Sequence, residues 1–206
     1  MRLHICTLLW DANGNSKDFS SMYDESWVEK LYRGFRRNLT VPFSFVCFVD
    51  RPRQFAEPDI EQQVLLSKDL HYGDCIEPYK LNKPMILCGL DTVVIGNIDH
   101  MAEYVMSGGR FALPRDPYRP DIACNGVALV PAGMRKVWKG YDGKRNDMEH
   151  VRMYDHAYLD DLFPGQIKSY KGHVKRRGWA GVKIVYFHGK EKPHELSDRV
   201  VKEHWR

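Results

Sequence analysis

The segment from Met85 to Asp99, M-I-L-C-G-L-D-T-V-V-I-G-N-I-D, constrains the fold more than any other part of the chain. Its unbroken apolar start, Met85 to Cys88, is typical of a strand buried on both faces in the centre of a parallel α/β sheet. Asp91 is therefore expected at the carboxyl end of a core strand, the edge where open α/β sheets bind ligands. Because an isolated buried carboxylate is costly, it needs a cation, a hydroxyl or backbone N–H groups. Two roles stay open for Asp91: a turn cap or a ligand contact.

A strand, a helix and a second strand begin the chain. The apolar strands are expected at Leu3 to Trp10 and at Phe43 to Val49. Between them, Ser26 and Glu29 have the spacing of a helix capping box, and an apolar face continues to about Leu39. A βαβ unit of this length predicts a parallel sheet with a right-handed crossover.

Shorter patterned segments extend this sheet. We expect strands at 64–66, 111–113, 124–130, 167–170 and 183–187, and helices at 98–106 and 147–163. This alternation predicts the α/β class, with a mostly parallel central sheet flanked by helices. The length of 206 residues predicts one domain, residues 1–206.

Composition narrows the function classes. A net charge of +4, from 31 basic and 27 acidic residues, is low for a protein that binds nucleic acid by charge alone. No apolar run has the length of a membrane span, and the first residues do not form a signal peptide, so no membrane insertion is expected. Five cysteines without a C-x-x-C pair are typical of a reducing compartment, which predicts a cytoplasmic location.

Two polar residues lie inside apolar patterns. Asp155 occupies a position in the apolar stripe of the helix expected at 147–163. Alternatively, the helix breaks near Tyr154, and Asp155 caps a second helix. Asn125, at the entry to the strand at 124–130, is either a turn former or a ligand contact, and the residues alone favour the turn.

The segment His188-Gly-Lys-Glu-Lys192-Pro193 follows the last expected strand directly. Each residue type suits a diphosphate held on a divalent cation: imidazole as a metal ligand, glycine for close backbone approach, and lysine for phosphate charge. Since this segment and Asp91 both lie at strand ends, together they would supply the imidazole and the carboxylate of one site.

With these segments, the chain resembles glycosyltransferase family 8, the glycogenin-like retaining enzymes of GT-A fold that use nucleotide-sugar donors. The resemblance extends over nearly the whole chain in order. It is carried by these segments: Cys6-Thr7-Leu8, Leu90-Asp91-Thr92-Val93 with Gly96-Asn97-Ile98-Asp99, Asn125-Gly126-Val127, Asp155-His156 with Tyr158-Leu159, and His188-Gly189 with Lys192-Pro193.

The resemblance implies a function and a set of site residues. The expected function is transfer of a sugar from a nucleotide-sugar, a UDP-sugar in particular, assisted by Mn²⁺ or Mg²⁺. Asp91 and His188 are the implied metal ligands, and Asp155 and Lys192 the implied catalytic residues, with Lys192 stabilising the departing diphosphate. The expected donor contacts are Thr7, Leu8, Lys80, Asp91, Thr92, Asn125, His188, Gly189 and Lys192.

The chain departs from the family pattern at several points. Gly89 stands where the family's D-x-D segment has its first acid, so one carboxylate is offered instead of two. His156 replaces the usual glutamine after Asp155, and the final signature is one residue shorter. Metal binding is therefore expected to be weaker, or completed by His156 or water.

Other functions and several acceptors stay open at this stage. Gly89 also fits a nucleotide-sugar-binding protein without transfer activity, whereas a nucleotidyltransferase is disfavoured because no Gly-rich phosphate loop follows the first strand. The acceptor is a glycan, a small molecule, a protein side chain or a hydroxylated DNA base. The basic segment 168–177 favours the polynucleotide option slightly.

Overall fold

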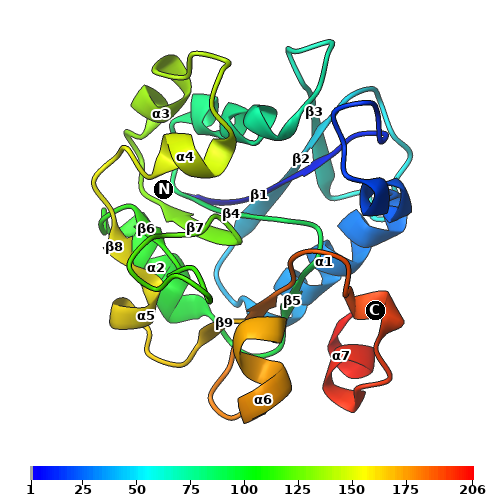
Figure 1. The fold of residues 1–206 in the computed structure, drawn as a ribbon, viewed down its shortest axis with the longest axis vertical. Helices are drawn as coiled ribbons and strands as arrows, with labels where there is room; N and C mark the ends of the chain where they lie inside the picture. The colour runs from blue at the N-terminus through cyan, green and yellow to red at the C-terminus, as the bar shows by residue number, and fades with distance from the viewer. Residues whose placement is uncertain (1) are drawn as a thin grey trace.

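The central sheet of the computed structural model, which describes residues 2–206, contains seven strands in the order β3-β2-β1-β4-β7-β6-β8 (Figure 1). Four neighbouring pairs are parallel, whereas β7 runs antiparallel to both β4 and β6. The predicted α/β class with a mostly parallel sheet is confirmed. The strands are β1 (Leu3–Leu9), β2 (Phe43–Val49), β3 (Ile60–Val64), β4 (Met85–Cys88), β6 (Ala112–Leu113), β7 (Val127–Val130) and β8 (Ala157–Tyr158).

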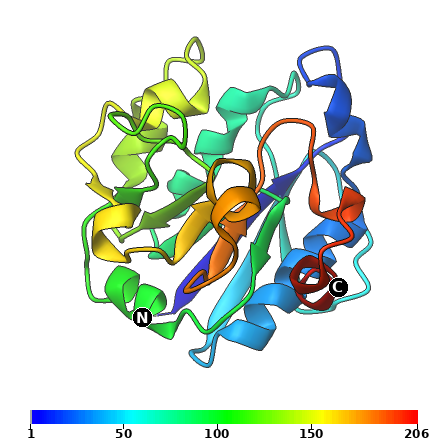
Figure 2. The same cartoon turned by 60° about the horizontal axis from the view of Figure 1, so that its bottom comes forward.

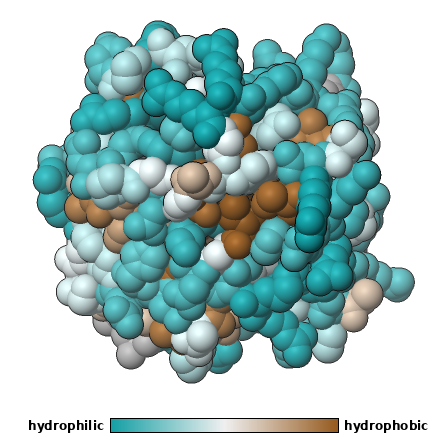
Figure 3. All heavy atoms as spheres, turned by 90° about the horizontal axis from the view of Figure 1, so that it is seen from below, coloured by the Kyte–Doolittle hydropathy of each residue, from teal (hydrophilic) through white to brown (hydrophobic). Residues whose placement is uncertain are grey.

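A second sheet of three strands, in the order β5-β10-β9, faces the viewer in Figure 2. Its strands are β5 (Thr92–Val94), β9 (Ile167–Ser169) and β10 (Ile184–Tyr186). The chain passes from β4 of the large sheet to β5 of the small one through the turn that carries Asp91. The face seen from below is mostly hydrophilic, with a hydrophobic band across its middle (Figure 3).

Helices cover both faces of the central sheet. In Figure 1, α3 and α4 lie above it and α1 and α2 below it. The α-helices are α1 (Glu25–Asn38), α2 (Asp99–Met106), α3 (Arg135–Lys139), α4 (Asp147–Val151), α5 (Leu159–Leu162), α6 (Lys175–Arg177) and α7 (Arg199–His204). The tighter or wider helical turns are η1 (Asp18–Met22), η2 (Tyr72–Leu81), η3 (Tyr170–Val174) and η4 (Pro193–Glu195). None of the helices within residues 2–206 is both long and apolar enough to cross a bilayer.

Alternation along β1 divides the core into two layers. Ile5 and Leu9 pack with α1 and α2, whereas Cys6 packs with η2, α3 and α4 on the other face. This is the period-two pattern of a strand covered on both sides. The apolar face predicted for α1 is buried, with Phe35 fully enclosed.

The start of α1 differs from the prediction. Asp24 caps the helix by accepting a hydrogen bond from the Ser26 N–H at 3.0 Å, so Ser26 is the second helical residue and not the cap. Glu29 accepts instead from the Ala56 N–H at 2.7 Å and fastens the loop after β2. The capping-box prediction is wrong because an aspartate two residues earlier competes for the same N–H groups.

The helix predicted at 147–163 is also wrong as a single element. After α4 the chain extends, and Ala157 pairs in parallel with Ala112 of β6 before α5 begins. The Ala157 N–H donates to the Phe111 carbonyl at 2.8 Å. The break near Tyr154 is therefore confirmed, because pairing with β6 overrides the helical pattern. The second half of that alternative is wrong: Tyr158, not Asp155, precedes α5, and no side chain caps it. β3 likewise starts earlier than predicted, at Ile60, where it pairs with Phe45 of β2.

Candidate functional site

A cavity of about 580 Å³ opens at the carboxyl ends of β1 and β4. Its walls include Leu8 and Trp10 from the end of β1, the turn from Gly89 to Asp91 after β4, and Lys192 from the C-terminal segment. The sequence places Asp91 at this edge, and the structure confirms that position. The cavity is therefore the candidate ligand site.

Asp91 and Lys192 form an ion pair in one wall. The Lys192 ammonium contacts Asp91 Oδ2, and the Tyr23 hydroxyl donates to the same oxygen at 3.1 Å. The side chains of Lys192 and Asp91 are only 2% and 13% exposed. Burial, and then the Asp91 charge, raises the pKa of Tyr23 far above its usual range. The phenol therefore stays protonated and remains a hydrogen-bond donor.

The small sheet brings these distant residues together. Tyr186 of β10 pairs antiparallel with Thr92 of β5, and the next N–H, of Phe187, donates to the Asp91 carbonyl at 3.2 Å. Gly189 then turns the chain with a φ of 69°, a conformation that costs glycine little. The Lys192 N–H donates to the Glu195 carboxylate at 3.1 Å, which fixes the start of η4.

His188 lies on the adjoining segment and is half-buried. Its Nε2 shares a hydrogen bond with the Ser169 hydroxyl at 2.8 Å, and its ring meets the Tyr118 ring edge-on, with centroids 5.5 Å apart. Burial, followed by the charge of Lys171, lowers the pKa of His188. The imidazole is therefore neutral at pH 7, with one nitrogen already engaged.

Both predicted metal ligands already have hydrogen-bond partners within the protein. Asp91 Oδ2 is engaged by Lys192 and Tyr23, and His188 Nε2 is engaged by Ser169. Gly89 offers no side-chain oxygen, and a Cβ added there would lie 2.9 Å from Asp91 Oδ1. Within residues 2–206 no three His, Cys, Asp or Glu side chains gather in a way that would hold a metal ion. Protein groups therefore occupy one oxygen of Asp91 and one nitrogen of His188, and metal binding by these two residues stays a prediction.

Asn125 and Asp147 line the cavity beside this wall. The Asn125 amide donates to Asp147 Oδ2 at 2.7 Å, while the buried Asn125 Oδ1 has no hydrogen-bond partner among the described residues. Burial raises the pKa of Asp147. The sequence interpretation missed Asp147, although Asn146 and Glu149 have N-cap spacing around it: Asn146 Oδ1 accepts from the Glu149 N–H at 2.9 Å.

Aromatic side chains form another wall. The rings of Trp10 and Tyr72 meet edge to face, with centroids 6.1 Å apart. The Tyr72 hydroxyl is held by the Ser20 hydroxyl at 2.8 Å and accepts from the Lys17 N–H at 3.2 Å. Leu8 adds an apolar surface. Flat rings beside an aliphatic side chain suit a planar heterocycle such as a nucleotide base.

Asp155 does not belong to the cavity, contrary to the prediction. Its side chain is 85% exposed and pairs with Arg110 at 3.0 Å. The reason is the extended segment before β8, which removes Asp155 from any apolar helix face. The carboxylate that faces the cavity from this part of the chain is Asp147, eight positions earlier.

Five other predicted donor contacts do not line this cavity in the described part of the chain: Thr7, Lys80, Thr92, His188 and Gly189. Lys80 pairs with Glu77 on η2, and its ammonium lies 5.3 Å from the centre of the Phe48 ring. Thr7 and Thr92 are enclosed within their strands. By contrast Leu8, Asp91, Asn125 and Lys192 all line the cavity.

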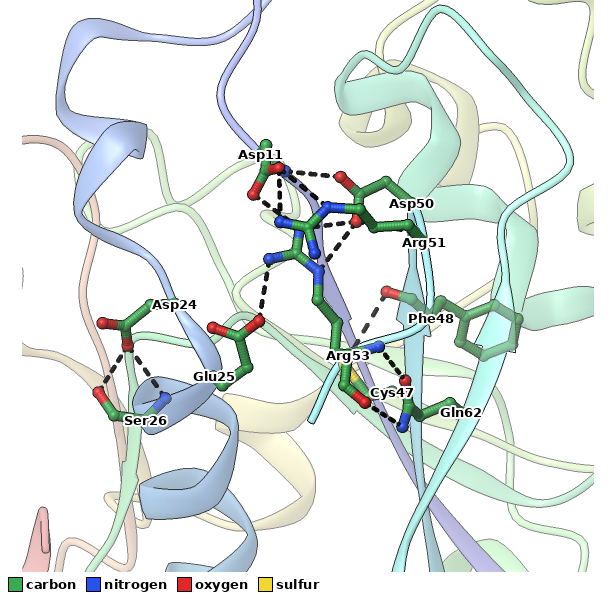
Figure 4. Close-up of polar contacts among 10 residues, drawn as sticks. All are labelled: Asp11, Asp24, Glu25, Ser26, Cys47, Phe48, Asp50, Arg51, Arg53 and Gln62. Carbon is green, nitrogen blue, oxygen red and sulfur yellow. Dashed lines mark hydrogen bonds and ion pairs between the residues drawn. The ribbon is translucent and has the colours of Figure 1, made fainter. Parts of the chain in front are cut away.

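A network around Arg53 fixes the loops that follow β1 and β2 (Figure 4). The Arg53 guanidinium, 3% exposed, contacts Asp50 at 2.6 Å, Asp11 at 2.8 Å and Glu25 at 3.1 Å. Despite burial, which acts in the opposite direction, hydrogen bonds from Arg51 and Arg53 lower the pKa of Asp11. Since Asp11 follows Trp10, this network holds the start of the aromatic wall.

No protein-family model matches the chain, and no curated protein matches it. Solved structures do match. One is the crystal structure of the glycosyltransferase GlyE in Streptococcus pneumoniae TIGR4, with a TM-score of 0.64 and 13% sequence identity. The match covers 99% of this chain and 59% of that one, so this chain spans less than two thirds of GlyE. The likeness shows a glycosyltransferase fold; membership of family 8 stays a prediction.

Proposed function

We propose that the protein is a glycosyltransferase that binds a nucleotide-sugar, specifically a UDP-sugar, in the cavity at the end of β1 and β4. The observation that carries the proposal is the buried Asp91–Lys192 pair in the wall of that cavity. It places one ammonium group beside an aromatic wall suited to a base, as a nucleoside diphosphate requires.

The chemistry follows from the position of Lys192. In sugar transfer the bond between the sugar C1 and the diphosphate oxygen breaks, and C1 bonds to an acceptor hydroxyl, which loses its proton. The diphosphate leaves with the electron pair, and a fixed ammonium stabilises that developing charge. Asp91 and Tyr23 hold the ammonium in place. We also propose retention of configuration at C1, which NMR of the product would test.

Mn²⁺ or Mg²⁺ assistance stays a prediction, and no step above passes through a cation. If Lys192 alone supplies the charge, donor turnover persists in excess EDTA and rises less than about threefold with added Mn²⁺. A cation that the reaction required would change turnover far more, because it contributes several kcal/mol to the stability of the transition state. Loss of turnover in EDTA with recovery in Mn²⁺ would instead support metal assistance.

A kinetic test uses purified protein with a panel of UDP-sugars, following UDP release. Lys192→Ala is expected to lower kcat by about 100-fold with a smaller change in KM, since leaving-group charge grows toward the transition state. Asp91→Asn should also abolish transfer in a protein that still folds, although with lower stability because Lys192 loses its carboxylate. Lys190→Ala is the matched control, because Lys190 is exposed in the same segment. A change confined to KM contradicts this role for Lys192.

The same assay separates the other functions. A protein that has lost transfer activity would bind UDP without releasing it from any UDP-sugar. A nucleotidyltransferase would consume a nucleoside triphosphate.

The basic segment 168–177 gives little support to a polynucleotide acceptor, because Lys168 pairs with Asp160 and Lys175 with Glu191. A glycan, a small molecule, a protein and a hydroxylated DNA base all stay acceptor candidates, and five free cysteines support the proposed cytoplasmic location.

A further inference from the structure

The strand order arranges the polar groups of the cavity in a row. β1, β4 and β7 are consecutive neighbours in the central sheet. At this edge β1 ends near Trp10, β4 is followed by Asp91, and β7 is preceded by Asn125. The pairing of β4 with β7 ends at Cys88 and Val127, so Leu90 and Asn125 both lie just beyond the paired strands at this edge. Since neighbouring strands lie about 4.8 Å apart, Asn125 is one strand farther from the aromatic wall than Asp91.

This row fits the order of groups in a nucleotide-sugar. With the base at Trp10 and the diphosphate at Lys192, the sugar would lie next to Asn125 and Asp147. That end offers acceptor oxygens: the buried Asn125 Oδ1, which has no partner within residues 2–206, and the carboxylate of Asp147. A buried acceptor without a donor is costly, and sugar hydroxyls are donors of the right kind.

The position of Asp147 is set by more than its bond to Asn125. Asn146 caps α4, so the backbone at Asp147 is fixed as the first residue of the helix. Burial raises the pKa of its carboxyl group, with the bond from Asn125 acting in the opposite direction. A carboxyl group held in a polar corner of a ligand cavity would gain hydrogen bonds when a hydroxylated ligand enters.

We propose that Asp147, with Asn125 beside it, binds hydroxyl groups of the donor sugar and determines which UDP-sugar the protein accepts. This inference rests on the proposed function. An epimer with one hydroxyl inverted would not form the hydrogen bond to the carboxylate, and buried polar groups discriminate strongly against such ligands. The sugar-facing acid would therefore be Asp147 in place of Asp155.

The test measures binding by calorimetry, which does not require turnover. UDP, UDP-glucose, UDP-galactose and UDP-N-acetylglucosamine are titrated into wild type, Asp147→Asn and Asn125→Ala. Both variants should bind UDP within about twofold of wild type, and the preferred UDP-sugar at least about tenfold more weakly, the loss of roughly one good hydrogen bond. Asp155→Asn is the matched control and should bind every ligand as wild type does.

The outcomes are distinguishable. If wild type binds UDP and discriminates among the UDP-sugars, and both variants keep its affinities, the sugar-binding role of Asp147 is wrong while the proposed function stands. If wild type binds neither UDP nor any UDP-sugar, the proposed function and this inference both fail. A crystal structure of wild type with the preferred UDP-sugar gives a second reading without variants: a sugar hydroxyl within hydrogen-bond distance of Asp147 supports the inference, and its absence overturns it.

Discussion

At the scale of single residues, Asp91 and Lys192 depend on each other. The carboxylate is largely enclosed, and the ammonium is almost fully enclosed. Removing one member of a buried ion pair leaves the other charge unsatisfied, whereas removing both leaves neither. Single and double variants of the pair therefore separate its contribution to the free energy of unfolding from its contribution to the proposed transfer reaction.

We predict that Lys192→Met lowers the free energy of unfolding by about 3 kcal/mol, because Asp91 loses its cation. The double variant Asp91→Asn, Lys192→Met should recover most of that loss and stay inactive. Urea titration of both proteins, with Lys190→Met as the control, measures the difference. A double variant less stable than Lys192→Met would contradict a coupled pair.

His188 makes stability depend on pH. Burial lowers its pKa below the ordinary value of 6.5, so between those two values the unfolded chain binds more protons than the folded one. Stability contributed by neutral His188 is thus present above pH 6.5 and is lost as pH falls through this window. Lys171 and Lys192 favour the neutral form, whereas Asp91 and Asp116 oppose it.

The matched variant for this effect is His188→Gln, which keeps a polar group near Ser169. We expect the free energy of unfolding to fall less steeply in the variant than in wild type as pH drops from 7 to 5. Urea titrations at each pH measure the two slopes. Equal slopes would show that the imidazole is not held neutral by the fold.

At the scale of elements, the Arg53 network joins the loops after β1 and β2 to the start of α1. Asp11, Asp50 and Glu25 come from three different segments and meet at one buried guanidinium (Figure 4). The backbone of Arg53 is also held: its N–H donates to Gln62 of β3 at 2.8 Å. This network fixes where the aromatic wall of the cavity begins.

We predict that Arg53→Met destabilises the protein by about 3 to 5 kcal/mol, because the three carboxylates lose their shared cation. Arg51→Met is the control: it breaks an exposed pair with Asp11 and should cost only about 0 to 1 kcal/mol. Thermal or urea unfolding distinguishes the two. Equal effects would mean that the network does not hold the loops together.

At the scale of the whole molecule, the cavity joins segments from both ends of the chain, so a bound nucleotide should stabilise the whole fold. UDP at about 100 times its Kd would add about 2.7 kcal/mol and raise Tm by roughly 5 to 10 °C. We expect this shift in excess EDTA, and at the same UDP concentration we expect a smaller shift in Lys192→Ala, because the variant binds UDP more weakly. Calorimetry with UDP, and with uridine at that same concentration as the control, measures the shift; equal shifts for the two ligands would exclude a contact with the diphosphate.

The sequence by itself determined the central strands, the buried face of α1 and the position of Asp91 at a sheet edge. These features depend on local periodicity. A strand that is buried on both faces, such as β4, appears in the sequence as a continuous apolar run. The nearness of the C-terminal segment to Asp91 also followed, because both segments adjoin strand ends.

Only the tertiary structure decided which side chains meet. The pairing of β8 with β6 moved Asp155 to the surface, and the break after α4 left Asp147 facing the cavity. The pairing of Asp91 with Lys192, and of Arg53 with Asp11 and Glu25, joins residues far apart in the chain. A periodic pattern specifies which face of an element is buried; it does not specify which charged group of another element lies opposite, because that depends on long-range pairing and packing.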